Sequence, residues 1–530
     1  MNKFLQRFAP KYKESSQQDV QVNTKQDDTL SNSLEQNILK ISELTGNSSD
    51  ISIRTFQGAN CLPMAIVYIT GLTDTLVIND NIVNPIMSDI EINSTQQRTL
   101  VNSFTAIKDK ILTVSATNTV SKIDDLMSAL FKGDTIILAE GWDQGISASS
   151  SKWLHRGIEE PSSQSVIRGP KDGFTEDISI NVALIRRRIK SSNLWKIDRK
   201  IGRVTQTDVS VMYLKGTAND LVVNEVLQRL DRIEIDGILE SGYLEEFIQD
   251  QTFTPFPTII NTERPDSVAA SILEGQVAVL VDGTPFVLIL PITFFKFFLA
   301  SEDYYQRFDI ATFLRLLRFI SFTISMILPS LYIAITTFHQ EMIPTTLLVS
   351  LAAQREGIPF PAFFEALMME FTFEVLREAG VRMPRAIGSA ISIVGALVLG
   401  QAAVEAGLVS AAMVIVVSFT AISSFVIPAF NISIAARLIR FILMVLAAAL
   451  GLFGIMSGLF FLLIHLLSLR SFGVPYLTPL APFVPNNMKD TFVRVPWWMM
   501  VTRPRLFAKE NYVRQNINKR PGPSDKESEK

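Results

Sequence analysis

The sequence predicts an α+β multi-domain protein, with a duplicated α/β soluble N-terminal domain followed by an α-helical polytopic membrane domain. Three observations carry this prediction. Four long, almost uncharged runs lie between Phe319 and Leu469, strand and helix patterns alternate through the first 285 residues, and landmarks in those patterns recur at a nearly constant offset. A helix rises about 1.5 Å per residue, so roughly 20 apolar residues cross the hydrocarbon core of a bilayer.

Composition narrows the classes of function. The 530 residues carry a formal net charge of −3, which gives no reason to expect nucleic-acid binding. The single cysteine, Cys61, leaves no intramolecular disulfide, and three histidines are too few for a histidine-based metal or catalytic cluster. We find no glycine-rich nucleotide motif, catalytic triad or paired carboxylates. We therefore expect no enzymatic activity, no cofactor and no metal.

The chain divides into five parts. We expect residues 1–36 to be a disordered polar leader, because they offer too little apolar surface to offset chain entropy. Residues 37–160 and 161–285 are the two α/β subdomains, residues 286–485 the helical membrane domain, and residues 486–530 a polar tail. The leader lacks the apolar core of a signal peptide, so we expect the soluble domain to stay in the cytoplasm.

The soluble region contains an internal duplication. An apolar strand ends at Gly71, and the same pattern ends at Gly216, 145 positions later. A helix followed by a strand is centred on Gly133, and its counterpart on Gly275 follows 142 positions later. A helix often ends at glycine, because the left-handed conformation there carries no Cβ penalty. The order and spacing of these landmarks predict two related subdomains.

One predicted helix in the second subdomain, Ile178–Ile189, ends in three consecutive arginines, Arg186, Arg187 and Arg188. Cations at a helix C-terminus interact favourably with the helix dipole. The pattern fits either a well-capped helix with a solvated end or a contact with another subunit or a membrane surface.

Basic residues flank the apolar runs. Arg315 and Arg318 precede the span Phe319–Phe338, and the positive-inside rule places that end in the cytoplasm. The runs Ala386–Val404 and Ala406–Ala436 read as a hairpin whose outer ends are both cytoplasmic. Its flanking basic residues are Arg382, Arg385, Arg437 and Arg440.

The last run, Phe441–Leu469, is long for one passage. Either it crosses twice and is broken near Gly451, Gly454 and Gly458, or it crosses once and the tail lies on the other side. The total is four to six spans by length.

Ala386–Val404 is the least apolar of the runs, and its small and hydroxyl side chains leave room for water. We interpret it as a candidate pore-lining helix, although tight helix packing explains small residues as well. The candidate pore-lining residues are Ser389, Ser392, Ala396, Gln401 and Glu405.

Charged residues recur one turn apart on the predicted amphipathic helix Phe363–Glu378. They are Glu370, Glu374, Arg377 and Glu378. The pattern fits a polar face in water, or a coupling helix that meets a partner or rings the mouth of a pore.

Several stretches together resemble the GerA family of spore germination proteins, specifically the A subunit of nutrient germinant receptors. The resemblance covers roughly residues 60–485 and spans soluble and membrane parts in order. The matching text is IRGPKDGFTEDISINVALIRRRI, TPFPTIINTERPDSVAASILEGQVAVLVDGTPFVLILP, DYYQR, PFPAFFEALMMEFTFEVLREAG and SFGVPYLTPLAPF.

The resemblance implies a multi-pass protein of the spore inner membrane with its soluble domain on the cytoplasmic (core) side. It implies a transporter-like B subunit and a lipoprotein C subunit as partners, contact with membrane lipid, and a homo-oligomer that forms a ligand-gated ion channel. Two alternatives stay open: a non-conducting scaffold for those partners, and a germination-amplifying channel of the dipicolinate-release system. A secondary transporter lacks support, because the apolar region shows no inverted repeat.

Overall fold

The computed structural model describes residues 29–57, 62–87, 104, 107–108, 112–114, 116–152, 161, 164, 166–382, 398–504, 506–508 and 511–515. The chain separates into two compact units. The first consists of residues 1–40, 53–68 and 75–150, and the second of residues 41–52, 69–74 and 151–530.

The first sheet has five strands in the order β1-β2-β4-β5-β3. The ladders β2–β4, β4–β5 and β3–β5 are antiparallel. Buried apolar side chains of β2 and β4, such as Ile66 opposite Ile137, form the core of this sheet. The strands are β1 (Ile51–Gln57), β2 (Pro63–Ile69), β3 (Thr117–Val120), β4 (Asp134–Ala139) and β5 (Gly145–Ser149), and the helical segments are α2 (Leu34–Leu44), α3 (Thr75–Ile78), η3 (Asn79–Val83) and α6 (Ile123–Leu130).

Residues 29–36 belong to the described structure, although the sequence assigns them to the leader. Helix α2 begins at Leu34, inside the stretch expected to be a disordered leader. Leu30 and Leu34 are buried, and the backbone of Leu30 bonds to Ser121. These two buried leucines attach the segment to the first unit. The prediction missed them because it rested on the average polarity of residues 1–36.

The second sheet repeats the strand order of the first, β6-β7-β9-β10-β8. Its ladders are also antiparallel, with Val211 opposite Val279 and Val279 opposite Leu288. The strands are β6 (Leu194–Ile201), β7 (Thr207–Leu214), β8 (Ile260–Thr262), β9 (Val277–Val281) and β10 (Val287–Leu290), and the helices are α7 (Ile178–Arg188), α8 (Asp220–Asp231), α9 (Ser241–Ile248) and α10 (Pro265–Leu273). A duplication predicts two sheets with the same strand order, and the structure has two such sheets.

Both faces of the second sheet are covered, because strand side chains alternate in direction. Along β9, Val279 packs with α8 and α9, whereas Leu280 packs with α7 and α10. The antiparallel ladders make this an α+β arrangement rather than a parallel α/β sheet, although strands and helices alternate along the chain.

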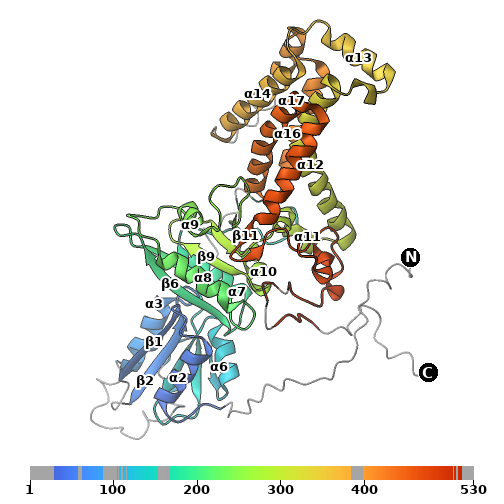
Figure 1. The fold of residues 1–530 in the computed structure, drawn as a ribbon. Helices are drawn as coiled ribbons and strands as arrows, with labels where there is room; N and C mark the ends of the chain where they lie inside the picture. Colours follow the sequence, from blue (N-terminus) through green and yellow to red (C-terminus); the bar gives the residue numbers. More distant parts are fainter. Residues whose placement is uncertain are drawn as a thin grey trace, which may run out of the picture. The chain divides into compact units, whose positions relative to one another are not determined.

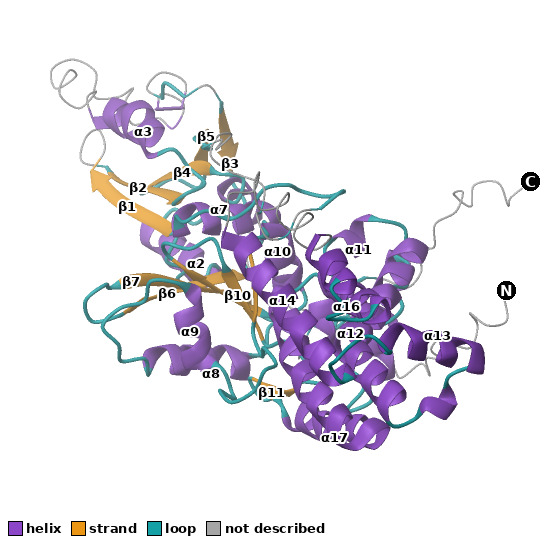
Figure 2. Cartoon of the chain, turned by 90° about the horizontal axis from the view of Figure 1, so that it is seen from above, coloured by secondary structure: helices purple, strands orange, loops and turns teal. Residues whose placement is uncertain are grey.

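The remainder of the second unit is largely helical (Figures 1 and 2). Helices α12, α14, α16 and α17 pack together, and α13 lies at the end of the bundle farthest from the second sheet. The segments are η5 (Phe294–Phe298), α11 (Glu302–Tyr305), α12 (Phe308–Thr337), η6 (Gln340–Met342), α13 (Thr345–Arg355), α14 (Ala362–Arg382), α16 (Ala411–Phe425), α17 (Phe430–Ser468), β11 (Arg470–Ser471), β12 (Val474–Pro475), η7 (Pro485–Asp490) and η8 (Trp497–Met499).

Two helices of the described chain are long and apolar enough to cross a membrane, Phe308–Thr337 and Phe430–Leu450. Their mean hydropathies are 1.8 and 2.1. Ala411–Phe425 and Leu452–Ser468 are apolar but shorter. Membrane association is therefore supported, while the count of four to six spans stays a prediction.

Helix α17 is a hairpin. Gly451 has φ 62° and ψ −140°, which breaks the helix. Beyond it the chain reverses so closely that a Cβ on Gly454 would lie 2.1 Å from the Leu446 carbonyl oxygen. Leu466 and Leu469 return to the core that holds Phe256 of the α/β part. Of the two alternatives for Phe441–Leu469, the structure has the break near Gly451, and the tail returns to the α/β end.

Candidate functional site

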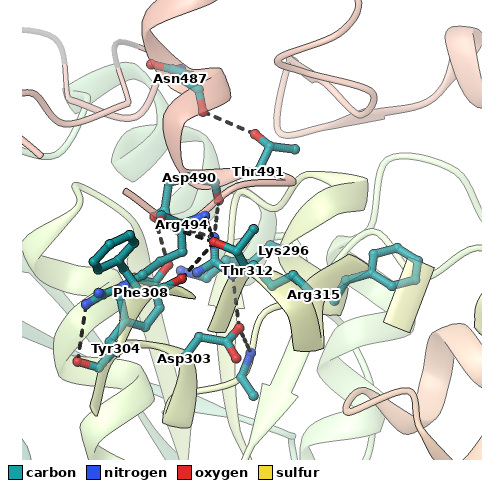
Figure 3. Close-up of polar contacts among 12 residues, drawn as sticks. Lys296, Asp303, Tyr304, Phe308, Thr312, Arg315, Asn487, Asp490, Thr491 and Arg494 are labelled. Carbon is teal, nitrogen blue, oxygen red and sulfur yellow. Dashed lines mark hydrogen bonds and ion pairs between the residues drawn. The ribbon is translucent and has the colours of Figure 1, made fainter. Parts of the chain in front are cut away.

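A polar cluster lies where the α/β part meets the first turns of α12 (Figure 3). Asp303 of α11 is fully buried and accepts hydrogen bonds from two arginines of α12. Arg315 Nε lies 3.1 Å from Asp303 Oδ2, and Arg318 Nη1 lies 2.8 and 2.7 Å from the two carboxylate oxygens. We call Asp303, Arg315, Arg318 and Asp490 the Arg–Asp cluster.

The tail completes the cluster. Arg315 Nη1 donates to Asp490 Oδ1 at 2.8 Å and to the Asp490 carbonyl oxygen at 2.9 Å. The Tyr304 hydroxyl donates to Asp490 Oδ2 at 2.8 Å. Burial raises the pKa of Tyr304 well above its usual value, and the charge of Asp490 adds to this shift, so the phenol stays a donor. The tail thus shares one hydrogen-bonded network with α11 and α12, although Asp490 stands 175 positions after Arg315 (Figure 3).

Aromatic and backbone contacts extend this network along the tail. The Arg494 guanidinium lies 5.5 Å from the Trp497 ring centre, and the Trp497 indole donates to the Tyr304 carbonyl oxygen at 3.2 Å. The Arg494 amide donates to Thr312 Oγ1 of α12 at 3.1 Å. The start of α12 is therefore bonded on one side to α11 and on the other to the tail.

The cluster gives two arginines of α12 partners that the sequence does not indicate. Arg315 and Arg318 precede a predicted membrane span, and their side chains are 0% and 9% exposed and paired with carboxylate. The cytoplasmic location of that end stays a prediction. Asp303 stands 12 and 15 positions before them in the DYYQR segment, which is a partner that spacing alone does not select. Buried arginine needs such a partner, because an unpaired charge in an apolar setting is costly.

Helix α14 places the candidate coupling residues against α17 rather than in open water. Glu370 and Arg440 are 0% and 1% exposed, and Arg440 Nη1 lies 2.6 Å from Glu370 Oε2. Glu374 pairs with Arg437, also at 2.6 Å. We call these two pairs the bundle pairs.

The other two candidate coupling residues differ. The Arg377 guanidinium lies 5.2 Å from the Phe425 ring centre and 5.6 Å from that of Phe430. Within the described residues, Glu378 pairs with Arg382 of its own helix alone, and both are exposed. Arg437 and Arg440, interpreted from the sequence as cytoplasmic flanks, are therefore engaged by α14. Whether these residues couple the subunit to a partner stays a prediction.

The candidate pore-lining residues lie mostly outside the described chain. Ser389, Ser392 and Ala396 fall in residues 383–397, which the structure does not describe. Gln401 and Glu405 are exposed and bonded to each other, with Gln401 Nε2 2.9 Å from Glu405 Oε1. The pore-lining role stays a prediction.

The arginine-ended helix of the second subdomain has one buried and two partly exposed arginines. Arg186 is fully buried and donates through Nε to Asp50 Oδ2 at 2.7 Å. Arg188 pairs with Asp172, and Arg187 donates to the Lys152 carbonyl oxygen. The predicted helix is confirmed as α7, with an Asp177 side chain capping its first turn. Because Arg186 is buried and paired with Asp50, it is neither solvated nor available to another subunit or a membrane surface.

Comparison with known proteins gives consistent matches. The family described as Bacillus/Clostridium GerA spore germination protein matches residues 39–506. Spore germination protein KA of Bacillus subtilis (strain 168) is 50% identical over 497 residues, 93% of this chain and 90% of the relative. Spore germination protein GerLA of Bacillus cereus is 38% identical over 91% of this chain and 97% of the relative.

One solved structure also matches. It is the N-terminal domain of the A subunit of the Bacillus megaterium spore germinant receptor GerK3, which is 44% identical. The match covers 50% of this chain and 97% of that one, with a TM-score of 0.40.

Proposed function

Because the chain belongs to the Bacillus/Clostridium GerA spore germination protein family, we propose that it is the membrane A subunit of a nutrient germinant receptor and oligomerises to form a ligand-gated ion path. The observation that carries this proposal is the extent of the family match, which runs through both the α/β part and the helical bundle. In this role the protein is not an enzyme, and it acts in the spore inner membrane with its α/β part on the core side.

The surface of the bundle supports a membrane location. Large apolar side chains are more than half exposed on several of its helices, among them Ile320, Ile415, Ile442, Phe453 and Phe461. Exposed apolar surface on this scale suits lipid or another subunit rather than water. The charges of the bundle pairs point inward, as ionisable groups in membrane proteins do.

The same features suit partners. The proposed neighbours are those that the family resemblance implies: a transporter-like B subunit, a lipoprotein C subunit and further copies of this chain. A passage for ions would then be built between copies, with Ser392 and Ala396 of the small-residue run on its wall.

Ion flux tests this proposal. The full chain, with and without its two partner subunits, is reconstituted in vesicles loaded with K⁺, and the efflux is measured with rich nutrient broth as the stimulus. We expect stimulated efflux from the complex, and Ala396→Trp should change the efflux at least fivefold without preventing assembly. Val204→Trp is the control, because Val204 is 73% exposed in the α/β part, outside the apolar surface of the bundle.

The outcomes separate the alternatives. Efflux that Ala396→Trp leaves unchanged contradicts the pore-lining role of that run. An assembled complex that conducts nothing with or without the broth favours the non-conducting scaffold.

A further inference from the structure

A cavity of about 720 Å³ lies within the second unit, beside the Arg–Asp cluster. Helix α10, the segment from η5 to α11, the start of α12, the α16–α17 connection and the tail all contribute to its wall. Its volume is within the range of small-molecule sites, about 300–1,000 Å³. The roles discussed above do not use this space.

The wall carries an excess of positive charge. Five basic residues line it, Arg264, Lys296, Arg318, Arg503 and Arg514, against three acidic ones, Asp266, Glu274 and Glu302. The cavity therefore favours an anion.

The acidic residues already have partners within the chain. Glu302 accepts from the Ile167 amide. Asp266 accepts from Arg264 and from the Tyr305 hydroxyl. Glu274 lies 3.3 Å from Lys296 Nζ and 3.4 Å from Arg514 Nη2. Burial alone would raise the pKa of Glu274, but these two cations outweigh it and lower the pKa, so this carboxylate stays ionised.

Arg503 differs from the other four cations. Its guanidinium donates to the carbonyl oxygens of Leu273 and Asn511, both at 2.9 Å, and to that of Val513 at 3.0 Å. No carboxylate lies within ion-pair distance of it in the part of the chain that the structure describes. Neutral carbonyls fix the position of this charge without cancelling it, so Arg503 is left to bind an external anion.

Another part of the wall is apolar. Phe425, Val426, Ile427 and Pro428 line the cavity from the end of the apolar helix α16, and Trp497 lines it from the tail. Phe425 is 63% exposed and Trp497 is 46% exposed. Tryptophan is enriched at the membrane–water boundary, where one end of the ring is apolar and the other wet. A small hydrophilic anion would gain nothing from this wall.

We propose that the cavity binds the headgroup of an anionic phospholipid, with its phosphate at Arg503 and Arg514 and its acyl chains along Phe425 and Ile427. Guanidinium groups match phosphate oxygens in charge and geometry. The inference rests on the proposed membrane location but not on ion conduction, so it can fail while the channel function holds, and the reverse.

Lipid titration tests the site. The full chain in detergent is titrated with short-chain phosphatidylglycerol, short-chain phosphatidylcholine or inorganic phosphate, and bound molecules are counted by native mass spectrometry. We expect one tight phosphatidylglycerol site, at least tenfold weaker binding of the zwitterionic lipid, and no displacement by millimolar inorganic phosphate.

Two variants approach the cavity differently. Arg503→Gln removes the cation, and Ala270→Trp fills the space from an exposed position on α10 without changing any charge. Each should weaken phosphatidylglycerol binding at least fivefold. Arg203→Gln is the control, because Arg203 is 82% exposed and pairs with Asp236 outside the cavity.

Three results would overturn the proposal. They are unchanged phosphatidylglycerol affinity in both variants with normal circular dichroism, equal affinity for the two lipids, and displacement by inorganic phosphate, which would assign the cations to a soluble anion. A variant that fails to fold leaves the other to decide.

Discussion

The Arg–Asp cluster and the bundle pairs are both buried ion pairs of the second unit, yet they are built differently. At the Arg–Asp cluster one carboxylate, Asp303, accepts from two arginines and from the Ala300 amide. In the bundle each carboxylate accepts one bond from one arginine. Glu370 Oε1 and Arg440 Nε have no partner within the described residues, whereas Arg315 lacks a partner only at Nη2.

This difference in hydrogen bonding indicates that the two sets of ion pairs have different structural roles. Shared, two-oxygen bonding fixes both the direction and the distance of the partners, which suits an anchor. A pair held by a single bond with unfilled hydrogen-bonding positions is costly to bury and free to accept another partner. We infer that the Arg–Asp cluster holds α12 firmly to the α/β part, while the bundle pairs hold α14 and α17 together less firmly.

The largest effect should come from removing the shared carboxylate. Asp303→Asn leaves two buried arginines without their common counter-charge, and breaking a buried pair in this way costs about 3–5 kcal/mol. The measurement is the free energy of unfolding of the full chain in detergent. Asp309→Asn, whose exposed pair with Arg307 is worth little, serves as the control. Equal stabilities for the two variants would refute the anchor.

A smaller loss is expected in the bundle. Glu370→Gln should lower the free energy of unfolding by about 2–3 kcal/mol, since Arg440 stays buried without a counter-charge. The double variant Glu370→Leu with Arg440→Met should recover most of it, because an apolar pair of similar volume replaces the charges. Glu378→Gln, on an exposed pair of the same helix, should change stability by less than about 0.5 kcal/mol. Failure of the double variant to recover would mean that the pair is an anchor too.

The smallest effect is expected at a carboxylate that has no ion pair among the described residues, Glu245. Burial, followed by the charges of Glu240 and Glu246, raises the pKa of Glu245 on α9 from 4.5 to about 7. The folded state therefore binds its proton more tightly than the unfolded state, and this contribution to stability is full below about pH 4.5 and lost as the pH rises through 7.

Glu245→Gln keeps the neutral form at every pH. At pH 8 it should stabilise the protein by roughly 1–2 kcal/mol relative to the wild type, and at pH 4 by almost nothing. Unfolding followed at both pH values checks this, with the exposed Glu234→Gln as the control. A gain of the same size at pH 4 would show that packing, not ionisation, is responsible.

The repeated strand order was predictable because the glycines that mark it are required by the backbone conformation at those positions. Gly133 and Gly275 have φ of 95° and 96°, and Gly141 and Gly283 have φ of 81° and 87°. A residue with a Cβ is strained there, so glycine appears in both copies. The break at Gly451 was predictable on the same ground.

The ion pairs were not predictable. Glu370 and Arg440 stand 70 positions apart, and the spacing within either helix does not select a partner on the other. The basic residues beside the apolar runs fit the positive-inside rule equally well as free or as paired groups. Only the tertiary structure distinguishes free from paired arginines. In it, Arg315, Arg318 and Arg440 are buried and paired with carboxylates.

Because α17 is a hairpin, both of its ends lie at one end of the bundle. The bundle begins with α12 at the Arg–Asp cluster, and the chain leaves α17 toward the tail at the same end. At the opposite end, where Gly451 lies beside His339, the described residues are held by the helices and their connections. Thirty helical residues such as those of α12 span about 45 Å. A tilt of about 5° at the base would carry the far end through roughly 4 Å, enough to reposition a whole side chain. A small rotation at the Arg–Asp cluster would therefore be amplified toward the other end of the bundle.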